Sequence, residues 1–269
     1  MIPATKEQEG SYVMDTEKIG ITRKNRGMAG FTGCPDEYLV IPPEMLVDGE
    51  IRRVDVIDDE AFWQCDGLRT VVIPGGPKLV GCSAFRDCGN LREVCLGDDI
   101  VAVGDSAFLC CYHLERVTLP AGLAAISSDA FTRCRALRQI ELPASLRLIG
   151  DYAFEDCSGL EHVTVPEGVT AIGKCAFVGC KSLEYIYLPK SIETIGDDVF
   201  EGCSFLKEIY FAGTLDEFSN VTRYTILGTS ATLICSDAVV KCKGNLPCAL
   251  TAMAGNVRKE KSIYAESWR

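Results

Sequence analysis

The sequence predicts a β-rich solenoid of stacked 23-residue coils with parallel β-strands and short helical or 3₁₀ turns. An Ala-Phe pair, a cysteine three residues after the Phe and a leucine three residues after that cysteine all recur at a constant step, and such a repeat defines the fold before any element is assigned. The step is 23 residues through seven units without an insertion. The pairs are Ala61-Phe62, Ala84-Phe85, Ala107-Phe108, Ala130-Phe131, Ala153-Phe154, Ala176-Phe177 and, with Val in place of Ala, Val199-Phe200.

Each unit begins with an alternating apolar segment, for which 137–143 is a clear example. Leu137, Ile140 and Leu142 interleave with polar residues and stop at Pro143, which is typical of a half-buried strand closed by a turn. The following Ala153-Phe154-x-x-Cys157 spacing suits one helical or 3₁₀ turn with its apolar side inward. A single coil cannot bury its own apolar face, so we expect the coils to stack with parallel strands ~4.8 Å apart.

Composition excludes several classes of protein. The chain has 269 residues, of which 47% are hydrophobic and 24% charged, so a disordered or fibrous protein is excluded. The formal charge of −11 argues against nucleic acid as a partner. No apolar run approaches a membrane span, and residues 1–20 lack a secretory signal. We expect a cytoplasmic protein, or a cell-surface or secreted one if a leader has been removed.

The 15 cysteines divide into two groups by their spacing. Seven occupy one repeat position and are predicted to form an interior column of small hydrophobic side chains with weak S–H donors: Cys65, Cys88, Cys111, Cys134, Cys157, Cys180 and Cys203. Sulfurs ~4.8 Å apart in a line fit neither a disulfide nor a tetrahedral metal site. The other eight lack metal-ligand spacing and are interpreted as packing or surface thiols: Cys34, Cys82, Cys95, Cys110, Cys175, Cys235, Cys242 and Cys248. The column favours a reducing compartment without deciding it.

The pattern L-x-x-V-x-(I/L)-P-x-x-V-x-x-I-G-x-x-A-F-x-x-C resembles the BspA-like leucine-rich repeats of bacteria and some protists. The resemblance spans roughly Leu39 to Asp237 and is closest in Leu137 to Cys157, Leu160 to Cys180 and Leu183 to Cys203. It implies a leucine-rich repeat solenoid that mediates adhesion when secreted and scaffolding when retained inside the cell. Local departures predict irregular turns: Pro77 replaces a branched residue, Asp58 and Ser127 replace the Gly, and Gly97 and Ala212 replace the Pro.

Four segments are predicted along the chain. Residues 1–38 form an N-terminal cap with a degenerate first unit, 39–211 the solenoid, 212–256 a terminating cap, and 257–269 a polar tail. Caps are expected because an uncapped stack exposes an apolar cross-section and an open strand edge.

No enzyme motif is present. The sequence has no phosphate-binding Gly loop and no nucleophile elbow, and neither His113 nor His162 has a recurring acidic partner. The sequence therefore predicts a non-catalytic protein without cofactor or metal.

The outward strand positions vary from coil to coil and are the candidate binding face. Aromatic residues gather toward the C-terminal end, and we select Glu141, His162, Tyr185, Tyr187 and Tyr210. Tyrosine offers a large contact area with few rotatable bonds, although its high strand propensity is an alternative explanation. We expect a monomeric protein–protein interaction module, adhesin-like or scaffolding, with an unidentified protein ligand. A structural spacer in a larger assembly, and more remotely an enzyme with an unrecognised site, stay open as alternatives.

Overall fold

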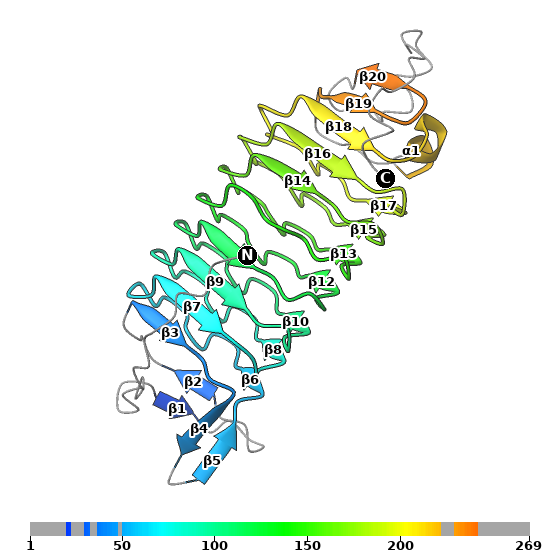
Figure 1. The fold of residues 1–269 in the computed structure, drawn as a ribbon. Helices are drawn as coiled ribbons and strands as arrows, with labels where there is room; N and C mark the ends of the chain where they lie inside the picture. The colour runs from blue at the N-terminus through cyan, green and yellow to red at the C-terminus, as the bar shows by residue number, and fades with distance from the viewer. Residues whose placement is uncertain (1–19, 23–29, 33–36, 48–49, 222–228, 242–269) are drawn as a thin grey trace, which may run out of the picture.

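The computed structural model describes residues 20–22, 30–32, 37–47, 50–221 and 229–241 (Figure 1). They form an elongated solenoid whose coils stack along one axis, as predicted. Long strands line one face and short strands line the opposite face, and the Ala-Phe turns join the two.

The long-strand face consists of two sheets in which every coil-to-coil pairing is parallel. Paired residues on neighbouring strands are 23 positions apart in the sequence through most of each sheet, as in Val71↔Val94 and Ile186↔Ile209. The length of the sequence repeat therefore sets the strand register. The first sheet contains β3 (Tyr38–Val40), β7 (Thr70–Ile73), β9 (Glu93–Leu96) and β11 (Arg116–Thr118). The second contains β14 (His162–Thr164), β16 (Tyr185–Leu188), β18 (Glu208–Phe211), β19 (Thr232–Ile234) and the antiparallel β20 (Val239–Lys241).

The short-strand face is also divided into two parallel sheets. The first contains β6 (Val56–Ile57), β8 (Leu79–Val80) and β10 (Ala102–Val103), and the second β12 (Ala125–Ile126), β13 (Leu148–Ile149), β15 (Ala171–Ile172) and β17 (Thr194–Ile195). The division between β10 and β12 falls beside Ser127, which stands where other coils have glycine. The Ser127 hydroxyl donates to the carbonyl of Val103 at 2.6 Å. One coil earlier, the equivalent residue Gly104 instead donates its main-chain N–H to the carbonyl of Val80.

The remaining elements lie toward the ends of the stack. Two antiparallel pairs precede or interrupt the first coils: β1 (Gly20–Thr22) with β2 (Gly30–Thr32), and β4 (Glu44–Val47) with β5 (Glu50–Arg53). Helix α1 (Leu215–Val221) follows β18 and buries Phe218. The four-segment division and the capping roles remain predictions, and the tail at 257–269 lies outside the described residues.

One expected strand is absent. The alternating segment that best exemplified the strand pattern, Arg138 to Leu142, belongs to no sheet, and no strand ladder links it to β11 or β14. Alternation determines which side chains point inward, and Ile140 is indeed buried while Gln139 and Glu141 are exposed. Strand pairing also requires neighbouring coils to approach to hydrogen-bond distance, which depends on packing between coils and not on the alternation.

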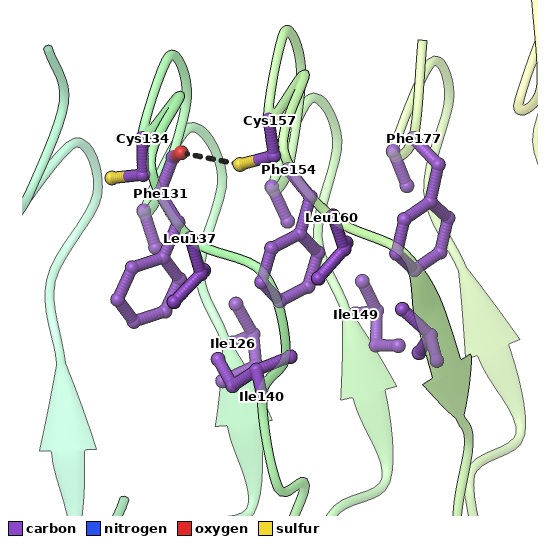
Figure 2. Close-up of a cluster of buried hydrophobic side chains, with 14 of the residues drawn as sticks. Ile126, Phe131, Cys134, Leu137, Ile140, Ile149, Phe154, Cys157, Leu160 and Phe177 are labelled. Carbon is purple, nitrogen blue, oxygen red and sulfur yellow. Dashed lines mark hydrogen bonds between the residues drawn. The ribbon is translucent and has the colours of Figure 1, made fainter. Parts of the chain in front are cut away.

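The core is a set of columns that run the length of the stack. Successive Phe rings from Phe62 to Phe200 are stacked, with centroids 5.0–6.1 Å apart and planes within 18°. Figure 2 shows three of these rings, Phe131, Phe154 and Phe177, aligned beside the leucine and isoleucine columns. Each column is built from the same repeat position of every coil, which explains why the residue type at the interior positions recurs along the sequence.

The Ala-Phe turns contain i→i+3 hydrogen bonds, such as Trp63 N–H to Glu60 and Cys65 N–H to Phe62, without forming a helix. Backbone in the left-handed region prevents a helix from forming. It occurs at the residue before each Ala (or Val199) and at the second residue after each Phe, with φ between 53° and 74°. The left-handed residues turn main-chain N–H groups toward the next coil. Phe62 N–H, for example, donates to the carbonyl of Ala84 at 2.7 Å.

Candidate functional site

The C-terminal part of the long-strand face brings four of the five predicted site residues together. Parallel pairing places His162, Tyr185 and Glu208 in one row and Thr164, Tyr187 and Tyr210 in the next. These are outward positions, because the intervening Val163, Ile186 and Ile209 are fully buried. We call His162, Tyr185, Tyr187, Glu208 and Tyr210 the tyrosine patch.

Ring contacts connect the tyrosine patch into one surface. His162 stacks on Tyr185 with centroids 5.4 Å apart, and Tyr185 meets Tyr187 edge to face at 5.6 Å. Tyr187 stacks on Tyr210 at 4.6 Å, and the Tyr210 hydroxyl donates to a carboxylate oxygen of Glu208 at 2.5 Å. These contacts hold the rings in place before any partner arrives, which lowers the conformational entropy lost on binding.

Glu141 is the predicted residue that the strand ladder does not join to the tyrosine patch. It occupies the same repeat position as Thr164 and Tyr187, but it lies in Arg138 to Leu142, which is outside the sheet. Its exposed side chain therefore sits on the same face without being fixed by strand pairing.

A groove of about 340 Å³ extends the tyrosine patch past the strand ends and was not predicted. Its walls are largely apolar, with Tyr187, Tyr210, Leu188 and Phe211 among the residues that line it. Ala212 lines the groove at the position held by Pro166 and Pro189 in the preceding coils, so a smaller side chain widens it there. The substitution of Ala for Pro was the one signal in the sequence that could have indicated this groove.

The seven repeat cysteines lie inside the turns, and all of them are buried. From Cys88 onward each thiol is directed at the carbonyl of the Phe 26 residues earlier, for example Cys157 Sγ to Phe131 O at 3.1 Å (Figure 2). Burial raises the pKa of Cys157 well above its usual value and that of Cys203 to about 12. A protonated, buried thiol is a poor nucleophile and a poor metal ligand.

The remaining cysteines occupy varied environments. Cys110, Cys175 and Cys235 are buried, Cys95 is half-buried and Cys82 is exposed, whereas Cys34, Cys242 and Cys248 lie outside the described residues. Within the described ranges, His, Cys, Asp and Glu side chains do not gather in any group of three that could hold a metal ion. Over the same ranges, no helix is long and apolar enough to cross a bilayer.

The other histidine lies away from the tyrosine patch. His113 is exposed, and its Nδ1 lies 2.6 Å from the carbonyl oxygen of Gly89 in the preceding coil. It contributes a coil-to-coil contact.

Comparisons with known proteins agree with the repeat. A family model described as "BspA type Leucine rich repeat region" matches in 6 copies over residues 55–147 and 124–230. No curated protein matches the chain.

Several solved structures are similar to this chain. A leucine-rich repeat protein of T. pallidum has 29% identity and a TM-score of 0.48, with 71% of this chain and 77% of that chain covered. One from Bacteroides ovatus has 22% identity and a TM-score of 0.38, with 84% and 78% covered. A leucine-rich cell surface protein from Faecalibacterium prausnitzii has 19% identity and a TM-score of 0.27, with 76% and 96% covered.

Proposed function

The chain belongs to the BspA-type leucine-rich repeat family, and on that premise we propose that it binds another protein through the tyrosine patch. The family model covers more than half of the chain, and repeat proteins of this kind are generally interaction modules. The observation that carries the proposal is the contact series from His162 to Tyr210, a preorganised aromatic surface on the face whose residues vary from coil to coil.

The groove beside the tyrosine patch supports the same function. An apolar depression lined by Tyr187 and Tyr210 is suited to an anchoring side chain, and aromatic residues around such a depression supply much of the binding energy in protein interfaces. Glu167 lines the groove and Glu208 lies beside it, so a partner with a basic residue next to an apolar one fits this surface best.

The proposal involves no catalytic step. Burial keeps column thiols such as Cys157 protonated, and within the patch the Tyr210 hydroxyl is already paired with Glu208. Whether the bound protein makes this chain an adhesin or an internal scaffold depends on the partner's location.

The experiment is an affinity capture with three proteins. The variant Tyr185→Ser/Tyr187→Ser/Tyr210→Ser removes the rings, and Tyr38→Ser/Tyr152→Ser is the control, because Tyr38 lies in β3 of the first sheet and Tyr152 lies in an Ala-Phe turn outside the strands of the long-strand face. We expect a partner that the wild-type protein and the control capture and the triple variant loses. Retention of every partner by the triple variant would exclude the patch as the interface.

A further inference from the structure

We propose that a second site, a cleft lined by arginine on the long-strand face, binds an acidic segment of a partner protein. The cleft lies where the long-strand face is interrupted between β11 and β14, and its volume is about 690 Å³. We call it the arginine cleft; its principal residues are Arg116, Arg135, Arg138, Gln139, Glu115 and Glu161.

The interruption leaves main-chain donors without acceptors. One coil earlier, the N–H groups of Glu115 and Arg116 both bond to the carbonyl of Arg92, at 2.8 and 3.1 Å. At the same register, the N–H groups of Arg138 and Gln139 have no acceptor among the described residues. Paired donors of this kind favour an incoming carboxylate, because a bound anion satisfies both at once.

Two guanidinium groups beside these donors have capacity for another anion. Arg135 lies over the ring of Tyr112 at 5.1 Å and forms no ion pair with any described residue. Arg138 has an 80% exposed side chain and approaches Glu161 only to 3.8 Å. Arg116 is already held by Glu93 through two contacts of 3.1 and 3.2 Å, so it adds positive potential more than a new contact.

The surroundings of the arginine cleft favour a protein over a nucleic acid. The chain carries a formal charge of −11, and Glu115 and Glu161 line the cleft itself, so a long polyphosphate is repelled where a few spaced carboxylates are not. Nearby on the same face, Val117 and Leu119 are only partly buried, although the equivalent Val94 and Leu96 are buried. An extended peptide that alternates acidic and apolar residues matches both features.

The test is fluorescence anisotropy with a labelled peptide of alternating Glu and Leu residues, titrated with full-length protein at low and physiological salt. The variant Arg135→Ser/Arg138→Ser should weaken binding by about tenfold or more, because two charge-assisted contacts are lost. The control Arg69→Ser/Arg147→Ser removes the same charge, with Arg69 at the repeat position of Arg138 and Arg147 beside β13 on the short-strand face. The control should bind as the wild type does.

Three results would overturn the proposal. They are no peptide binding by the wild type, an equal loss in both double variants, and tighter arginine-dependent binding of duplex DNA than of the peptide. Arg135, Arg138 and Arg147 are exposed and Arg69 is half-buried, and thermal unfolding of each variant verifies that the fold is retained. The triple tyrosine variant should bind the acidic peptide normally, so this test is independent of the proposed function.

Discussion

At the scale of single residues, the environment of the cysteine column explains why cysteine recurs at this position of every repeat. Each thiol is buried, and from Cys88 onward each directs its S–H toward a carbonyl one coil away, as Cys180 does to Phe154 at 3.2 Å. A larger side chain would not fit between the coils, and a more polar one would cost more to desolvate. We therefore interpret the column cysteines as packing residues.

This role predicts how stability depends on pH. Burial raises the folded-state pKa of five column thiols, Cys111, Cys134, Cys157, Cys180 and Cys203, above the usual value of 9.0, to about 12 for Cys203. The folded state keeps these protons when the unfolded chain would release them, so the thiols' contribution to stability is complete below pH 9 and falls as pH rises toward 12. Each such thiol should lower the free energy of unfolding by about 1.4 kcal/mol per pH unit in that window.

Denaturant titrations between pH 7 and 11, with parallel thiol labelling, measure this effect. Exposed Cys82 should react in the native protein, while the seven column thiols should react only after unfolding without reductant. A flat stability profile across pH 9 to 11, or disulfides among the column thiols, would contradict the packing role.

Two glycines give a matched pair of substitutions. A Cβ at Gly173 would lie 2.4 Å from the main-chain nitrogen of Asp151 in the preceding coil, whereas a Cβ at Gly122 would meet nothing within 4 Å. Gly173→Ala should destabilise the fold by about 2–3 kcal/mol, because rigid backbone cannot move aside. Gly122→Ala should change stability by no more than about 1 kcal/mol, in the stabilising direction. Thermal and urea unfolding measure both, and equal effects would show that close coil contact does not explain the glycine.

At the scale of elements, the sequence predicted the coil well and the contacts between coils less well. Repeat spacing located the strands, the Ala-Phe turns and the stacking direction, because inward side chains such as Val163 and Ile186 must recur for the columns to form. It did not predict the interruption at Arg138 to Leu142, where the alternation is intact but the coils are not paired. The departure at Ser127 indicated irregularity near this place without specifying which ladder would break.

Hydrogen exchange tests this interruption. The amides of Arg138 and Gln139, which have no acceptor in the described part of the chain, should exchange on the order of 100-fold or more faster than those of Glu184 and Tyr185 in the intact second sheet. Addition of the acidic peptide should slow exchange at Arg138 and Gln139 selectively. Equal protection of the two pairs in the free protein would mean that the strand ladder is continuous.

At the scale of the whole molecule, a uniform interior supports an exterior that differs from end to end. The outward rows change from charged residues such as Glu93 and Arg116 in the first sheet to aromatic residues in the second. Composition and register were enough to predict that Tyr185, Tyr187 and Tyr210 share a face. The groove beside them and the exclusion of Glu141 from the sheet depend on side-chain volume and coil spacing, which one sequence does not specify.

The central claim is that a protein partner docks on the tyrosine patch, and site-specific photo-crosslinking tests it most directly. A p-benzoylphenylalanine residue substituted for Tyr187 lies within the patch, and the same residue substituted for exposed Leu148 in β13 lies on the opposite, short-strand face. Irradiation in an extract containing the captured partner should give a discrete adduct from position 187 and none from position 148. Adducts from position 148 alone, or equal adducts from both positions, would contradict the claim.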